Sequence, residues 1–197
     1  MPRRNPKAKP NVYAFIDSQN LNLGTQKIGW KMDWRKFRKY LADKYNVTHA
    51  YMFIGYMVEN ESLYEHMHEL GYLIALKPTL EISSQQAEGT DQSVARELKP
   101  GEEEHARPVV KGNIDADLVL YAMKELPNYD KAIIVSGDGD FLSLVEYLDQ
   151  QGKLLHIMTP NWQYSSLLKQ YEDRIVRIDQ LKRELAYHDR KKFIKKT

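Results

Sequence analysis

The chain has 197 residues, no cysteine and a formal net charge of +2. This length fits one domain that buries roughly 70% of its unfolded surface, and the lack of cysteine excludes a disulfide framework. No apolar run approaches the roughly 20 residues of a membrane span, and MPRRNPKAKP has no apolar stretch typical of a secretory signal. We therefore expect a cytoplasmic protein with a single core and no membrane partner.

The predicted elements alternate along the chain. Strand patterns fall near residues 12–17, 48–54, 72–77, 132–136 and 154–158, with a weaker one at 175–178, and helical patterns fall near 33–45, 60–70, 114–126, 139–151, 163–171 and 180–193. Glycines at 71 and 152 look like helix C-caps directly before strands. This alternation is typical of right-handed βαβ units in a mostly parallel sheet and predicts an α/β fold.

The first strand ends in an acid. An apolar run from Val12 to Ile16 is closed by Asp17, and Ser18, Gln19 and Asn20 come directly after it. An aspartate at the end of a strand is often only a helix cap or a turn residue. The same feature recurs further along the chain, which favours a functional interpretation.

A long stretch without strand or helix pattern runs from residue 79 to 110 and is rich in Ser, Gln, Glu and Gly. A loop of this length is usually functional or disordered. Because it lies directly before the next acidic block, it could serve as a lid or a substrate guide, and simple disorder is an equal alternative.

The next block, KGNIDADLVLYAMKEL, places Asp115 and Asp117 in the first turn of a predicted helix. Negative charge there stabilises a helix by roughly 0.3 to 1 kcal/mol, which would explain both acids without a function. The functional alternative is that this helix neighbours the next strand and projects a carboxylate into the crevice at its end.

The third block is the most informative. In AIIVSGDGDFLSL a buried strand pattern stops at Ser136-Gly137, a helical pattern comes next, and Asp138 and Asp140 lie on the turn between them. In parallel sheets such turns lie at the carboxyl edge, where ligands bind. The sequence therefore predicts a site at this edge.

These blocks carry a family resemblance. FIDSQN, KGNIDADLVLYAM and IIVSGDGDFLSLVEYLDQQGK resemble, in order and separation over residues 11–178, the three blocks of NYN domains, the branch of PIN-like ribonucleases that includes the LabA-like proteins. The resemblance implies a PIN-like three-layer α/β/α sandwich with a metal-dependent ribonuclease site. Its acidic positions match Asp17, Asp115, Asp138 and Asp140, and its asparagine matches Asn20. Two residues separate KG from Asp115, where the family often has one, so Asp117 stays an alternative to Asp115.

Charge chemistry independently favours a cation at these acids. Several carboxylates in one crevice raise each other's pKa, and a divalent cation resolves the repulsion. With no cysteine in the chain and no histidine in the three blocks, the oxygen donors favour Mg²⁺ or Mn²⁺ over zinc. We expect Asp17 and Asp138 to bind the metal directly and Asp115 and Asp140 to act through the metal or its waters. Asn20 would orient a water or a phosphate.

RNA is the expected partner, single-stranded or structured. The candidate substrate contacts are Ser18, Lys111, Ser136 and Trp162, the last in a PNWQY loop where an exposed indole could stack on a base. Aromatic residues between cations at 30–37 have the same potential, although such aromatics are more often core residues. Residues 1–10 carry +4 and residues 182–197 carry +5, leaving −7 between them. These basic ends either attract a polyanion or serve as solubilising tails.

The sequence thus predicts a basic tail at 1–10, a nuclease domain at 11–180 and a basic helix or tail at 181–197. One alternative is a catalytically weak RNA-binding or scaffold module of the same fold. Another is a phosphatase of the haloacid dehalogenase type, which needs a second aspartate two residues after Asp17, where this chain has Gln19. The sequence leaves open RNA against DNA, one metal or two, and whether the chain forms a homodimer.

Overall fold

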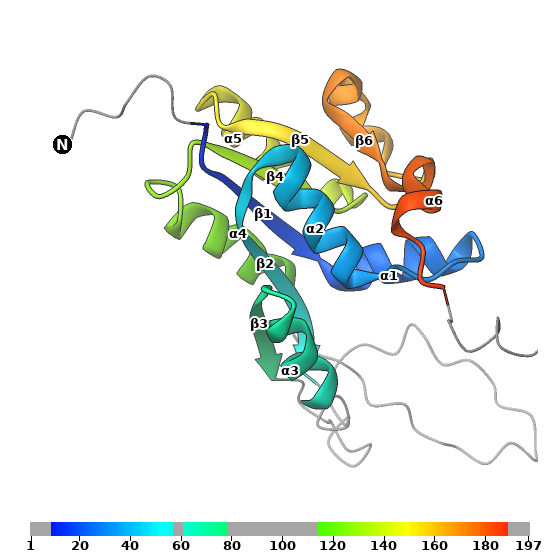
Figure 1. The fold of residues 1–197 in the computed structure, drawn as a ribbon. Helices are drawn as coiled ribbons and strands as arrows, with labels where there is room; N and C mark the ends of the chain where they lie inside the picture. The colour runs from blue at the N-terminus through cyan, green and yellow to red at the C-terminus, as the bar shows by residue number, and fades with distance from the viewer. Residues whose placement is uncertain (1–8, 57–60, 79–113, 189–197) are drawn as a thin grey trace, which may run out of the picture.

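A computed structural model describes residues 9–56, 61–78 and 114–188, which form a sheet with helices on both faces (Figure 1). The predicted lid segment at 79–110 and Lys111 lie outside the described residues. Most of the basic ends, residues 1–8 and 189–197, lie outside them as well. In the described part, no helix has the length and apolar character needed to cross a membrane.

The sheet is parallel throughout, in the order β3-β2-β1-β4-β5-β6. Its strands are β1 (Val12–Asp17), β2 (Val47–Tyr56), β3 (Leu73–Pro78), β4 (Lys131–Val135), β5 (Leu154–Thr159) and β6 (Ile175–Arg177). The predicted α/β class with a mostly parallel sheet is therefore confirmed.

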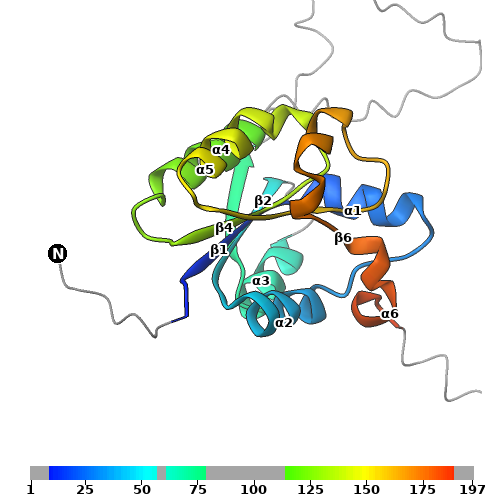
Figure 2. The same cartoon turned by 90° about the horizontal axis from the view of Figure 1, so that it is seen from above.

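Helices and 3-10 segments cover the sheet or link its strands. The helices are α1 (Ser18–Lys27), α2 (Trp34–Tyr45), α3 (Glu61–Glu69), α4 (Ile114–Lys124), α5 (Leu142–Gln150) and α6 (Lys182–Leu185). The 3-10 segments are η3 (Gly139–Phe141), η4 (Ser166–Arg174) and η5 (Ile178–Leu181). Seen from above, α4 and α5 lie on one side of the sheet and α2 and α3 on the other, which gives three layers (Figure 2).

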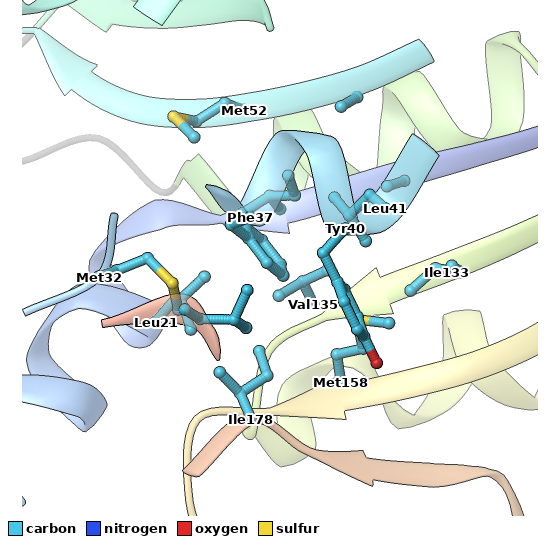
Figure 3. Packing of buried hydrophobic residues seen from close by; sticks show 14 of the residues in the cluster. Leu21, Met32, Phe37, Tyr40, Leu41, Met52, Ile133, Val135, Met158 and Ile178 are labelled. Carbon is cyan, nitrogen blue, oxygen red and sulfur yellow. The ribbon is translucent and has the colours of Figure 1, made fainter. Parts of the chain in front are cut away.

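Side-chain alternation along the strands fills both interfaces between the layers. On β1, Val12, Ala14 and Ile16 enter the core beneath α2, whereas Tyr13 and Phe15 enter the core beneath α4 and α5. Figure 3 shows the first of these cores, in which Phe37 and Leu41 of α2 meet strand residues such as Val135. A sheet covered on both faces needs apolar strands throughout, as the sequence pattern indicates.

The helix α1 is not predicted by the sequence pattern. Its sequence SQNLNLGTQK is mostly polar and contains glycine, so it has little intrinsic preference for a helix. Tertiary structure supplies what the propensity lacks: the Asp17 side chain caps the helix by accepting from the Asn20 backbone N–H, and Leu21 and Thr25 are fully buried. Packing therefore decides the conformation of this segment.

Two of the predicted helices also differ from the structure. The segment predicted as a helix at 163–171 is the 3-10 segment η4, which runs on to β6 and begins only at Ser166, behind a serine cap. The segment predicted at 180–193 contains η5 and α6, and α6 ends at Leu185. It stops there because Ala186 is extended and forms an isolated antiparallel bridge with Met32.

The strand order defines where a site should lie. From β1 the chain moves outward to β2 and β3, and from β4 it moves outward in the opposite direction through β5 and β6. The connections therefore reverse direction between β1 and β4. In open α/β sheets, ligands bind beyond the carboxyl ends of the strands at this switch point.

Candidate active site at the carboxyl ends of β1 and β4

Asp17 is the last residue of β1 and lies at the switch point. Its side chain is almost fully buried, and its two oxygens accept hydrogen bonds from the Asn20 backbone N–H at 3.0 Å and from Ser136 Oγ at 3.1 Å. Burial raises the pKa of the Asp17 carboxyl, the two hydrogen bonds oppose that rise, and the nearby Asp138 carboxylate adds to it. The fold thus holds an acid where its charge is unfavourable.

Ser136 connects the ends of the two central strands. Its buried hydroxyl donates to Asp17 Oδ2 and accepts from the Asp138 backbone N–H at 3.1 Å. The Asp138 carboxylate in turn accepts from the Asp140 backbone N–H at 3.0 Å and caps η3. This chain of bonds fixes the loop that carries both acids relative to Asp17.

Gly139, between the two acids, packs closely against neighbouring side chains. A Cβ placed on Gly139 would lie 2.3 Å from Ser165 Oγ and 3.0 Å from Leu167 Cδ1. A larger residue there would force these two side chains to shift. The acidic loop therefore rests directly against the start of η4, with Asp138 half-buried and Asp140 exposed.

Asn20 ties α1 to the same loop. Its side-chain oxygen accepts a hydrogen bond from the Gly137 backbone N–H at 2.9 Å. An asparagine is suited to this position because it offers an acceptor to the loop and keeps an amide N–H₂ group as a donor. The contact brings FIDSQN and SGDGD, which lie far apart in the sequence, into one site.

Asp115 joins the cluster from the first turn of α4. Alternation along β1 sends Asp17 toward the face that carries Tyr13 and Phe15, which is the face that α4 covers. Burial raises the pKa of the Asp115 carboxyl, and the carboxylates of Asp17, Asp138 and Asp140 raise it further. Hydrogen bonds through Ser136 link Asp17 to the loop of Asp138 and Asp140, and Asp115 lies near enough for these carboxylates to influence its pKa.

The donor set suits a hard cation, although the acids do not form a finished metal site. Within residues 9–56, 61–78 and 114–188, no three His, Cys, Asp or Glu side chains are grouped closely enough to hold an ion. Mg²⁺ is usually held by one or two carboxylates with waters in its remaining positions. The oxygen donors of Asp17 and Asp138 fit that requirement, and a cation would relieve the repulsion that raises the pKa of Asp115.

The predicted substrate contacts occupy different environments. The Ser18 hydroxyl is buried and donates to the Phe53 carbonyl at 2.7 Å, and Ser136 is engaged as described above. Both hydroxyls are thus engaged within the protein, and a contact of either serine with a substrate stays a prediction. Trp162 is 54% exposed, which suits a contact surface, whereas Trp30 and Phe37 are core residues.

Two residues near the site have no counterpart among the predicted contacts. Asn161 is buried, and its side chain donates to the Gly24 carbonyl at 2.8 Å and accepts from the Gln163 backbone N–H at 2.7 Å. Lys27 lies in the last turn of α1, on the same helical face as Asn20 and Gly24. The spacing of residues 20, 24 and 27 identifies this face only once the segment is recognised as a helix.

A doubly wound parallel sheet with carboxylates at its switch point defines a class of α/β proteins with a ligand site at that edge. The NYN domain model matches residues 11–179, and the chain belongs to this family. This match confirms the predicted family resemblance. NYN domains are PIN-like and are generally nucleases.

Two similar proteins extend this comparison. The chain is 23% identical over 172 residues to the "Low amplitude and bright protein LabA" of Synechococcus elongatus, a match that covers 85% of this chain and 83% of that protein. A crystal structure of a protein of unknown function from Vibrio parahaemolyticus shares the fold with a TM-score of 0.64 at 21% identity, covering 93% of this chain and 100% of that one.

Proposed function

We propose that this protein is a metal-dependent ribonuclease that hydrolyses RNA phosphodiester bonds. The observation that carries the proposal is that Ser136 joins Asp17 to the loop of Asp138 and Asp140 at the switch point. Burial raises the pKa of nearby Asp115, and these carboxylates raise it further. A fold tolerates such repulsion where function requires it, and perturbed carboxyl groups are typical of catalytic sites. Membership of a family whose members are generally nucleases supports the same conclusion.

The residues of the site have distinct proposed roles. Asp17 and Asp138 hold Mg²⁺ or Mn²⁺, and Asp115 and Asp140 act through its water shell. When bound, such an ion would polarise a phosphoryl oxygen and supply an activated water. The Asn20 amide N–H₂ donates to the substrate phosphate or to a water, because its oxygen is already engaged by the Gly137 N–H. Ser136 keeps Asp17 and the acidic loop in register.

A second candidate is an RNA-binding module with negligible turnover. The observation that favours it is that, in the part of the chain the structure describes, no three potential ligands already form a metal site. A module of this kind would retain the fold and the acidic loop and bind RNA without cutting it.

A cleavage assay separates the two candidates. Labelled single-stranded RNA, duplex RNA and single-stranded DNA are incubated with the protein in Mg²⁺, in Mn²⁺ or with a chelator. We expect metal-dependent cleavage of RNA, reduced by Asp138→Asn about 100-fold or more, since even outer-shell groups of metal sites contribute roughly 10- to 100-fold. Asp43→Asn is a matched control, because Asp43 is an exposed acid of α2 that pairs with Lys39.

Two results would contradict the proposal. Binding of RNA without cleavage in either metal would favour the binding module. Cleavage by Asp138→Asn at the rate of the unmodified protein would remove the acidic loop from the reaction. A circular-dichroism melting curve checks that each variant is folded.

A further inference from the structure

A groove with a volume of about 200 Å³ lies directly beside the acidic site. Asn20, Leu23 and Lys27 of α1 form one wall, and Gly137, Pro160 and Gln163 form the other. The volume is below the roughly 300 to 1,000 Å³ of a pocket for a drug-sized ligand, so the groove suits a single small group. Its polar amides and its cation point to a ligand with both hydrogen-bonding groups and negative charge.

The two walls are held firmly together. A Cβ added to Gly24 would lie 2.4 Å from Pro160 Cβ, so α1 and the loop at 160–163 approach as closely as a glycine permits. Buried Asn161 donates to the Gly24 carbonyl and accepts from the Gln163 N–H. The groove is therefore formed before any ligand arrives, which reduces the entropic cost of binding.

The groove and the acidic site share two residues. Asn20 and Gly137 line the groove, and the hydrogen bond between them joins α1 to the loop that carries Asp138 and Asp140. A ligand group seated in the groove is thus next to the proposed reaction centre. An RNA strand with one group in the groove would extend into the acidic site.

An exposed aromatic residue, Trp162, belongs to the loop that forms one wall of the groove. Trp162 lies between two lining residues, and the Arg177 guanidinium is 5.8 Å from its ring centroid. Arg177 is itself fixed by two hydrogen bonds to Asp179, at 3.1 and 2.6 Å. An indole held in this way offers a stacking surface at little conformational cost, as single-strand-binding proteins use.

We propose that this groove and Trp162 bind one unpaired nucleotide of an RNA strand, with the base stacked on Trp162 and a backbone phosphate near Lys27. The position of this nucleotide next to the scissile phosphate rests on the proposed function; the binding itself does not. A paired base has its faces covered by its neighbours in the duplex, so it cannot stack on the indole. The substrate class is therefore single-stranded RNA or the unpaired part of a structured RNA.

The test measures binding in a chelator, where no metal-dependent cutting occurs. A fluorescently labelled single-stranded RNA of mixed sequence and its duplex are titrated with the protein, and anisotropy gives the dissociation constant. Trp162→Ala is expected to weaken single-strand binding about 10-fold or more, within the range for loss of one base stack, and Trp162→Phe to retain most of it. Duplex binding should change little.

The salt dependence of binding and the tryptophan fluorescence provide two further measurements. Lys27→Ala should reduce the slope of log K against log salt by about 0.7, the value for one phosphate contact on a single strand. Tryptophan fluorescence should be quenched by the single strand in the unmodified protein, since Trp30 is buried, Trp34 is partly buried against the core and Trp162 is exposed. The quenching should disappear in Trp162→Ala.

Matched controls are Tyr187→Ala, which removes an aromatic that is 58% exposed, and Lys124→Ala, which removes an exposed cation from the last turn of α4. Unchanged single-strand affinity in Trp162→Ala, or no RNA binding by the unmodified protein, overturns the proposal. Trp162-dependent binding without cleavage in Mg²⁺ or Mn²⁺ supports the groove and contradicts only the ribonuclease. RNA cleavage together with an unchanged RNA affinity of Trp162→Ala supports the ribonuclease and contradicts the groove.

Discussion

The two ends of the central strands β1 and β4 use aspartate in opposite ways. At the amino end, Asp130 accepts a hydrogen bond from the Asn11 backbone N–H at 2.8 Å, and its own backbone N–H donates to the Asn11 carbonyl at 2.8 Å. This pairing joins the starts of β1 and β4. The Asp130 carboxylate thus stabilises the sheet by satisfying a backbone donor.

At the carboxyl end, aspartates oppose one another. Asp17, Asp138 and Asp140 all raise the pKa of Asp115, and Asp138 contributes to the raised pKa of Asp17. Among the described residues, no Lys or Arg forms a salt bridge with Asp17, Asp138 or Asp140. The same residue type therefore satisfies a backbone donor at one edge of the sheet and meets like charges at the other.

A first test separates two acids of one helix turn. Asp115→Asn should lower RNA turnover by about 10-fold or more, as for other groups that support a metal site, because it removes a carboxylate from the cluster. Asp117→Asn, the matched control, should leave turnover nearly unchanged. Initial rates in Mg²⁺ check both variants, and equal losses would remove the distinction between them.

Metal binding should stabilise the folded protein through the acids at the carboxyl ends of β1 and β4. Mg²⁺ or Mn²⁺ at about 100 times its dissociation constant should raise the free energy of unfolding by about 2.7 kcal/mol. Differential scanning calorimetry with and without the ion checks this without any activity measurement. The increase should vanish in Asp138→Asn and persist in Asp130→Asn, and an increase that survives in both variants would place the ion elsewhere.

Removing one acid from each end should change stability with opposite signs. Asp130→Ala leaves the Asn11 N–H without its carboxylate acceptor and should lower the free energy of unfolding by about 1 kcal/mol. Asp115→Asn should raise it, because a raised pKa means that the charged form is unfavourable in the folded state. Urea unfolding without divalent ions measures both, and a loss in Asp115→Asn as large as in Asp130→Ala would contradict the comparison.

The smallest expected effect is the pH dependence of that gain. Below its ordinary pKa of 3.8, Asp115 is protonated in the folded and unfolded states alike, so Asp115→Asn should change little. As pH rises from 3.8 through the raised folded pKa, the unfolded state ionises more readily than the folded state, so the free energy of unfolding of the unmodified protein falls. The gain should therefore grow from about pH 4 upward and then level off, whereas a gain that shrinks over this range would show the opposite shift.

Much of the fold could be predicted because its strands are short apolar runs that end in turn residues. The acids at the ends of β1 and β4 are identified by the same pattern, since a strand that stops at Asp17 or Ser136 places the residues directly after it at one edge of the sheet. The choice between Asp115 and Asp117 is harder from the sequence, because both lie in the first turn of α4. In the structure, burial and the carboxylates of Asp17, Asp138 and Asp140 raise the pKa of Asp115.

The remaining features depend on contacts between distant segments. The polar segment of α1 becomes helical through burial of Leu21 and Thr25, which local propensity does not reveal. The groove wall depends on the close approach of Gly24 to Pro160, and the engaged hydroxyl of Ser136 depends on its placement beside Asp17. Gly24 and Pro160 lie far apart in the sequence, as do Ser136 and Asp17, so no local sequence pattern predicts these contacts.

The bond between Ser136 and Asp17 spans 119 residues of the chain and crosses the boundary between the two central strands. During synthesis, Asp17 is in place long before its partner exists, and the pair forms only when β4 docks beside β1. Assembly of the acidic centre is therefore a late event that coincides with closure of the sheet. A chain interrupted before β4 lacks the hydroxyl and the loop that complete this centre.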